Sequence, residues 1–176
     1  MKLSDLKNKI RNIPDFPIKG IMFRDITTLI GDPESLRFVV EHLYQRYSNK
    51  NIDSIVAIES RGFIFGGALA HLLGCGIVPA RKPGKLPYET IAEEYDLEYG
   101  TASLELHNDA LQAGDRVLII DDLLATGGTL QAAADLVKRL DAEIVECAVI
   151  IELDYLNGRD NLPGVNIYSM VNYDSE

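Results

Sequence analysis

Short, unbroken apolar runs alternate with helical patterns along most of the chain. Such runs are typical of strands that are covered on both faces, as in a parallel sheet. They predict strands at residues 54–58, 76–80, 117–120, 143–153 and 165–170. Because helical stretches separate the runs, the pattern favours one α/β domain with a mostly parallel sheet and helices on both faces.

Apolar residues recur at steps of three and four in the intervening segments, which predicts helices there. These helices are expected at residues 3–13, 33–47, 62–73 and 130–140. Pro14 should end the first helix, and Asp32 is a favoured capping residue for the second. No internal repeat, low-complexity tract or domain linker interrupts the 176 residues.

Two carboxylates, Asp121 and Asp122, stand where the strand at 117–120 is expected to end. Small residues, two glycines and two threonines follow before the next helix. Gly127 and Gly128 let the backbone approach a ligand closely, and N–H groups at a helix start can hold an anion. The acids can accept hydrogen bonds from sugar hydroxyls or hold a hydrated cation. The alternative interpretation is an ordinary strand-to-helix turn with solvated acids.

Cations follow two further strands. Arg61 comes after the strand at 54–58, so it should lie at the same sheet edge as Asp121. Arg81, Lys82 and Lys85 follow the strand at 76–80 and could attract a polyanion. Surface residues without a function are the competing interpretation for all four cations.

Phe23 and Arg24 lie in a segment without clear periodicity, at residues 19–29. An aromatic face beside a charged pair could cover a flat ligand, but the chemistry alone favours a connector with Phe23 in the core. The long, acidic stretch at 88–106 is a candidate mobile lid or hairpin. An exposed hairpin without a role is the alternative.

Composition places the chain among ordinary globular proteins, with 47% hydrophobic and 25% charged residues. The net charge of −10 argues against general binding to nucleic acids or anionic membranes. Cys75 and Cys147 match no metal or redox spacing, so reduced structural thiols are expected. The three histidines form no metal-ligand pair. The sequence has neither a signal peptide nor a transmembrane run, so a cytoplasmic protein is expected.

The string at 117–129 resembles the phosphoribosyl pyrophosphate (PRPP) signature of type I phosphoribosyltransferases. Four further motifs occur in order: Phe23-Arg24-Asp25-Ile26, Glu59-Ser60-Arg61-Gly62-Phe63, Arg81-Lys82-x-Gly-Lys85-Leu86-Pro87 and Leu97-Glu98-Tyr99-Gly100. Together they resemble the adenine phosphoribosyltransferases over nearly the whole chain. The resemblance implies one domain of 176 residues with the type I phosphoribosyltransferase fold. An N-terminal hood is then expected at about residues 1–30 and a flexible lid at about 83–104.

The resemblance also implies roles for individual residues. The ribose and its 5′-phosphate would be bound by Asp121, Asp122, Ala125, Thr126, Gly127, Gly128 and Thr129. The pyrophosphate would be bound by Ser60, Arg61, Arg81, Lys82 and Lys85, and the family often has a non-proline cis peptide before Ser60. Adenine would be bound by Phe23, Arg24 and Leu153. Glu98 and Arg61 would be catalytic.

The implied reaction converts adenine and PRPP into AMP and pyrophosphate, as in purine salvage. Mg²⁺ would arrive with PRPP, and Asp121 is the candidate protein ligand. The family also implies a homodimer. Residues 87–96 depart from the eukaryotic pattern, which leaves the lid contacts open.

Two other functions stay open at this point. One is transfer to another purine, such as xanthine or hypoxanthine, because base preference depends on the pocket around Phe23 and Arg24. The other is a PRPP-sensing regulator that binds nucleic acid. The regulator would need a basic face or an added DNA-binding segment, and the sequence has neither.

Overall fold

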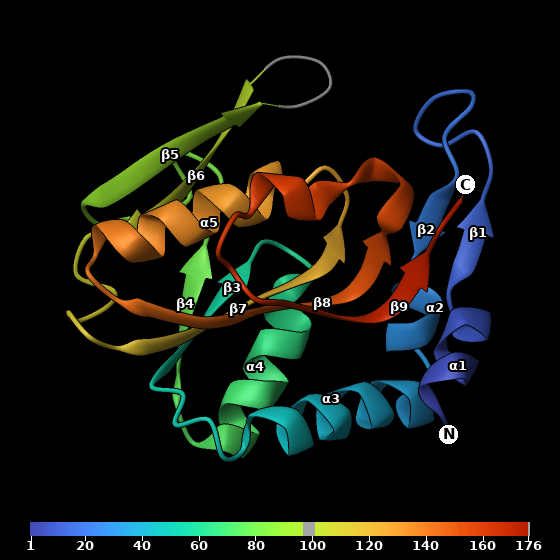
Figure 1. The fold of residues 1–176 in the computed structure, drawn as a ribbon, viewed down its shortest axis with the longest axis horizontal. Coiled ribbons are helices and arrows are strands. Elements are labelled where there is room, and N and C mark those ends of the chain that lie inside the picture. Colours follow the sequence, from blue (N-terminus) through green and yellow to red (C-terminus); the bar gives the residue numbers. More distant parts are fainter. Residues whose placement is uncertain (97–100, 176) are drawn as a thin grey trace.

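A five-stranded parallel sheet forms the middle of the molecule, in a computed structural model that describes residues 1–96 and 101–175 (Figure 1). Its strands lie in the order β4 (Gly76–Ala80), β3 (Ser54–Ile58), β7 (Arg116–Leu124), β8 (Glu143–Leu153) and β9 (Ile167–Tyr173). All neighbouring pairs are parallel, which confirms the predicted sheet. The carboxyl ends of β3, β7 and β8 therefore lie at one edge.

Helices cover both faces of this sheet. The two helices α3 (Pro33–Tyr47) and α4 (Gly62–Leu73) lie on one face, and α5 (Gly128–Arg139) lies on the other (Figure 1). Along β7, Leu118 belongs to the core under α3 and α4, whereas Ile119 belongs to the core under α5. Alternate side chains of a strand point to opposite faces. Both faces are buried, which explains the unbroken apolar runs.

Two antiparallel ribbons flank the sheet. One pairs β1 (Arg11–Ile13) with β2 (Phe23–Asp25), and the other pairs β5 (Thr90–Asp96) with β6 (Thr101–His107). The second ribbon lies beside α5 and confirms the predicted hairpin (Figure 1). Its movement as a lid, and the hood at residues 1–30, stay predictions.

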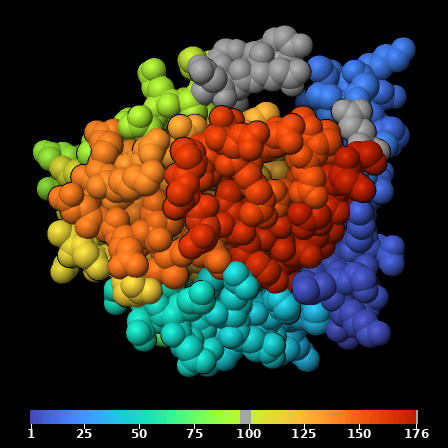
Figure 2. Space-filling model, viewed as in Figure 1, coloured from blue at the N-terminus to red at the C-terminus, as the bar shows by residue number. Residues whose placement is uncertain are grey.

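Short helical turns complete the chain. They are α1 (Leu3–Leu6), η1 (Lys7–Lys9), α2 (Thr27–Ile30), η2 (Asp154–Leu156) and η3 (Gly158–Asn161). The N-terminal residues lie against β9, where Lys7 Nζ donates to the Asn172 carbonyl at 2.9 Å. Figure 2 shows the N-terminal part of the chain, in blue, beside the C-terminal part, in red. No helix within the described ranges is long and apolar enough to span a membrane.

The acidic pair does not end its strand, contrary to the prediction. β7 continues through Asp121 and Asp122 to Leu124, because its backbone stays paired with β8 as far as the Leu124–Glu152 pair. Both carboxylates are buried, at 8% and 5% exposure. Polar residues inside a strand are tolerated when their side chains have partners, which the site supplies.

Three other predictions about elements were wrong. The N-terminal helix ends by residue 9, because Ile13 pairs with Phe23 in a β-ribbon. Phe23 lies in β2 and is only partly buried, so it is not a core residue of a connector. The last strand spans Ile167–Tyr173, where it pairs with β8, and not residues 165–170.

Candidate active site

A cavity of about 250 Å³ lies at the carboxyl edge of the sheet. The loop after β3 contributes Arg61 and the loop after β4 contributes Lys82. The end of β7, the following loop and the first turn of α5 contribute residues 121–130. Arg61 and Asp121 thus share one edge of the sheet, which confirms the prediction made from their positions after two strands. Tyr95 of β5 also lines the cavity, so the hairpin borders it.

Arg61 reaches the acidic pair because α4 begins very close to β7. A Cβ on Gly62 would lie only 2.8 Å from the Ile120 carbonyl oxygen, so glycine permits this approach. Arg61 Nε donates a hydrogen bond to the Asp122 carboxylate. The Asp122 amide in turn donates to Asp121 Oδ1 at 2.8 Å. Burial and then the negative charge of Asp122 raise the pKa of Asp121 well above its usual value.

Glu59 gathers the cations of the neighbouring loop. Its buried carboxylate accepts hydrogen bonds from Arg81 Nε at 3.0 Å, Lys85 Nζ at 2.6 Å and the Lys82 amide at 3.1 Å. Burial favours the neutral form, but the hydrogen bonds from Lys85, Lys82 and Arg81 lower the pKa of Glu59. Of these three cations Lys82 lines the cavity, whereas Arg81 and Lys85 are paired with Glu59 and are not part of the lining.

The peptide between Glu59 and Ser60 is cis, as the resemblance implies. This peptide immediately precedes Arg61 and the first turn of α4. Ser60 lies outside the lining of the cavity, although both of its neighbours are part of that lining.

The loop from Ala125 to Gly127 and the first residues of α5, Gly128 and Thr129, also line the cavity. Gly127 is the N-cap of α5 and has a φ of +90°, which strains any residue with a Cβ. The first N–H groups of a helix have no acceptor within it, and the helix dipole favours a negative charge there. This end of α5 therefore fits a phosphate group.

A second cavity, of about 530 Å³, adjoins the first. Phe23 and Arg24 of β2 line one side of it, and Leu153 at the end of β8 lines another. Leu123 and Ala125 line both cavities, so the two lie next to each other. The structure thus brings together the three residues that the resemblance assigns to a base.

Arg24 is held in place by its neighbours. Its Nη1 donates to Asn12 Oδ1 at 2.7 Å, and its guanidinium lies 4.0 Å from the centre of the Tyr173 ring. Its Nε is buried and has no partner among the described residues. The side chain is therefore fixed against Tyr173 beside the cavity, which residues 18–24 line.

A metal ion would find few protein ligands here. No group of three or more His, Cys, Asp or Glu side chains in the described part of the chain could hold one. Asp121 and Asp122 supply carboxylate oxygens at the cavity, and Asp122 is already paired with Arg61. Mg²⁺ commonly binds through one or two carboxylates and the phosphates of a substrate. The two acids fit that arrangement.

The sequence did not single out several residues of the site. Glu59 accepts hydrogen bonds from the Arg81 and Lys85 side chains and the Lys82 amide. The sequence signal for this role was a carboxylate at the end of a buried strand, with cations after the next strand. Tyr155 and Leu156 extend the wall formed by Leu153. Their large side chains directly after β8 were the sequence signal that they line this cavity. The predicted catalytic Glu98 lies outside the described residues.

Comparisons with known proteins agree with this geometry. The family model described as "Phosphoribosyl transferase domain" matches residues 28–164. The adenine phosphoribosyltransferase of Syntrophotalea carbinolica is 56% identical over 171 residues, which cover 97% of this chain and 100% of that protein.

Two solved structures have the same fold. That of the adenine phosphoribosyltransferase of Thermoanaerobacter pseudethanolicus is 49% identical with a TM-score of 0.94, covering 98% of this chain and 100% of the other. That of the Saccharomyces cerevisiae enzyme, complexed with adenine and an imino-altritol bisphosphate, is 39% identical with a TM-score of 0.90, covering 96% and 97%. Similarity of this extent leaves one assignment: the chain belongs to the phosphoribosyltransferase family, among its adenine phosphoribosyltransferases.

Proposed function

We infer that this chain transfers the 5-phosphoribosyl group of PRPP to N9 of adenine, giving AMP and pyrophosphate. One observation carries the proposal: the cavity at the start of α5, which fits a phosphate, and the mostly apolar cavity lined by Phe23 and Leu153 share Leu123 and Ala125. A nucleoside monophosphate has an anion and a flat base joined by a sugar, so it would span both. The similar yeast enzyme was solved with adenine bound, which supports adenine as the base.

The residues of the first cavity suit the parts of PRPP. The amides of residues 125–129 would hold the 5′-phosphate at the start of α5. Asp121 and Asp122 would accept hydrogen bonds from the ribose hydroxyls. Arg61, Lys82 and the Ser60 peptide would bind the diphosphate, with Arg81 and Lys85 released from Glu59 to assist.

The reaction forms a bond between N9 of the purine and C1 of the ribose while the bond from C1 to the pyrophosphate oxygen breaks. Positive charge develops on the sugar ring and negative charge on the leaving diphosphate. Arg61 and Lys82 would stabilise that negative charge from fixed positions, which is the most effective way to lower such a barrier. Mg²⁺ bound with PRPP would supply further positive charge to the diphosphate.

Adenine must lose its N9 proton when the new bond forms. Glu98 is proposed as the group that exchanges a proton with the purine, a role worth about 10²–10⁴-fold in rate. Its neighbours in the chain, β5 and β6, form the hairpin beside the cavity. Closure of this hairpin would keep water away from the reactive sugar.

The direct test is pyrophosphate release from PRPP with adenine, hypoxanthine, guanine or xanthine supplied one at a time. The proposal expects release with adenine far above that with the other three purines. Greater pyrophosphate release with xanthine or hypoxanthine would identify that purine, and not adenine, as the substrate. Binding of RNA or DNA without any base-dependent release would favour the regulatory function instead. A homodimer and a cytoplasmic location stay predictions from the resemblance.

A further inference from the structure

The segment that follows β8 lines the base cavity and contacts the phosphate-binding loop. Its first part, η2, places Tyr155 and Leu156 in the wall of the base cavity, next to Leu153. Leu153 belongs to the core and Tyr155 packs against it, whereas Leu156 is 39% exposed. Burial therefore holds the first part of this wall, and polar contacts add to the anchoring of the residues that follow.

The second part of the segment, η3, lies against the phosphate-binding loop. A Cβ on Gly158 would lie 2.2 Å from the Ala125 carbonyl oxygen, and one on Gly127 would lie 2.2 Å from the Gly158 carbonyl oxygen. Asn161 Nδ2 also donates to the Thr126 carbonyl at 2.7 Å. The two backbones are in direct contact, so a shift of η3 must also move the loop.

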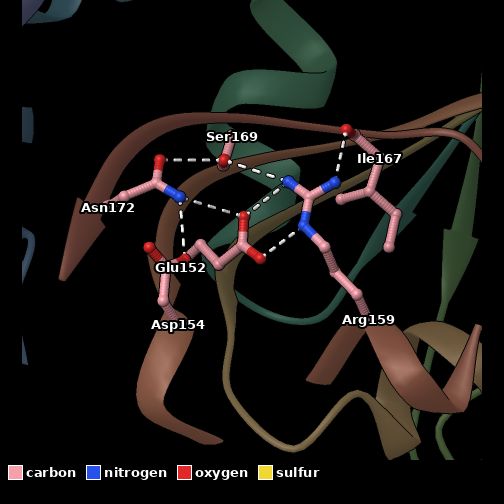
Figure 3. Close-up of polar contacts among 6 residues, drawn as sticks. All are labelled: Glu152, Asp154, Arg159, Ile167, Ser169 and Asn172. Atoms are coloured by element: carbon pink, nitrogen blue, oxygen red, sulfur yellow. Dashed lines mark hydrogen bonds and ion pairs between the residues drawn. The ribbon is translucent and has the colours of Figure 1, made fainter. Parts of the chain in front are cut away.

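A bidentate ion pair between Arg159 and Glu152 anchors this segment to the sheet (Figure 3). Arg159 Nε and Nη2 donate to the two oxygens of Glu152 at 2.6 and 2.7 Å, and Nη1 donates to the Ile167 carbonyl at 3.1 Å. Asn172 Nδ2 donates to Asp154 Oδ1 at 2.8 Å, which ties η2 to β9. Burial alone would raise the pKa of Glu152, but the hydrogen bonds from Arg159 keep it below its usual value.

We propose that Arg159 and Glu152 are positioning residues for the transfer reaction. Their ion pair fixes residues 153–161, and this segment sets the base cavity and the phosphate-binding loop at the spacing that one nucleotide requires. Neither residue is part of the lining of the two cavities of the site, so both act through the segment. The inference rests on the proposed transfer to a purine.

The chain offers a matched control on the same strand. Arg46 Nε and Nη2 donate to the two oxygens of Glu146 at 2.7 and 2.9 Å, six positions before Glu152 on β8. Glu146 is also largely buried, at 7% exposure. This pair joins α3 to the sheet and lines neither cavity, so R46M should lower stability without touching the site.

The experiment compares KM for adenine, KM for PRPP and thermal stability in R159M and R46M. We expect both KM values to rise by about tenfold to a hundredfold in R159M, because misplacement of binding groups by about 1 Å has effects of this size. R46M should keep the KM values of the unchanged protein at a similar loss of melting temperature. The proposal would be overturned if the unchanged protein, R159M and R46M had equal KM values. An equal rise of KM in the two variants would also overturn it.

A double variant separates positioning from simple stability. In E152Q/R159M no charge stays buried without a partner, so the melting temperature should recover while KM for adenine stays high. Recovery of KM together with stability would contradict a positioning role. If R159M does not fold, the double variant and R159K, which keeps the charge without the fork, provide the comparison with R46M. Absence of any turnover in the unchanged protein would overturn the proposed function itself, and this inference with it.

Discussion

Arg61 Nε donates a hydrogen bond to the Asp122 carboxylate and so joins the loop after β3 to the end of β7. The arginine side chain is 43% exposed, whereas that of Asp122 is 8% exposed. An arginine has five N–H donors, and this bond uses one of them. The guanidinium can therefore stay oriented by Asp122 and still offer donors to an anion in the cavity.

Loss of this guanidinium should impair transfer strongly. We expect R61Q to lower kcat/KM by about 10²–10³-fold, the usual effect of removing one fixed group that stabilises developing negative charge. Steady-state rates with adenine and PRPP provide the measurement. R116Q is the control, because Arg116 pairs with Glu143 at the opposite end of β7. A change of less than about threefold in R61Q would remove Arg61 from the mechanism.

Substitution of Gly127 tests the phosphate-binding loop. In G127A the new methyl group would meet the Gly158 carbonyl oxygen at 2.2 Å, in addition to the strain of a φ of +90°. We expect a large rise in KM for PRPP and a lower melting temperature. G114A is matched in backbone strain, at a φ of +86°, but its methyl group meets nothing within 4 Å. It should cost about 1–2 kcal/mol of stability and leave KM unchanged. Similar KM values in the two variants would contradict the account.

Asp121 should make stability depend on pH. Because burial and the charge of Asp122 raise its pKa in the folded state, Asp121 binds a proton more strongly there than in the unfolded chain. The proton on Asp121 therefore stabilises the folded state fully below the usual pKa of 3.8. This stabilisation is lost as the pH rises through the raised pKa of the folded state.

The variant D121N removes this dependence and keeps an oxygen for the Asp122 amide. Its melting temperature should exceed that of the unchanged protein by a margin that grows as the pH rises above 3.8. D109N, in the exposed turn after β6, serves as the control. A difference in melting temperature between D121N and the unchanged protein that stays constant or shrinks with rising pH would show that the charge of Asp121 does not destabilise the folded protein.

Glu98 is tested by E98Q. We expect turnover to fall by about 10²–10⁴-fold while the affinity for PRPP stays nearly intact, since the amide cannot exchange a proton with the purine. Single-turnover rates and PRPP binding are the two measurements. E94Q changes an exposed carboxylate of the same hairpin and should behave like the unchanged protein. Unchanged turnover in E98Q would exclude Glu98 as the proton-exchanging group.

Much of the fold could be predicted from the sequence, because strands buried on both faces give unmistakable apolar runs. The bounds of β3, β4 and β8 match the predicted ones. The end of β7 could not be found in this way. Asp121 and Asp122 look like residues that end a strand, and only Arg61, 61 positions from Asp122, explains why they are buried within one.

The two parts of the site differed in how far they could be predicted. The residues of the phosphate-binding loop are contiguous in the chain, so their chemistry could be predicted from the sequence. The base cavity joins β2 with the end of β8 and the turn after it, and these come together only in the fold. Glu59 was missed for a similar reason, since its role depends on where Arg81 and Lys85 reach in space.

A structure of the complex with AMP tests the central claim most directly. The account predicts that the phosphate will accept hydrogen bonds from the amides of residues 125–129, with the purine between Phe23 and Leu153. The sugar should then lie beside Leu123 and Ala125, where the two cavities meet. A phosphate bound at Arg61 and Lys82, or a purine outside the cavity of Phe23 and Leu153, would contradict it.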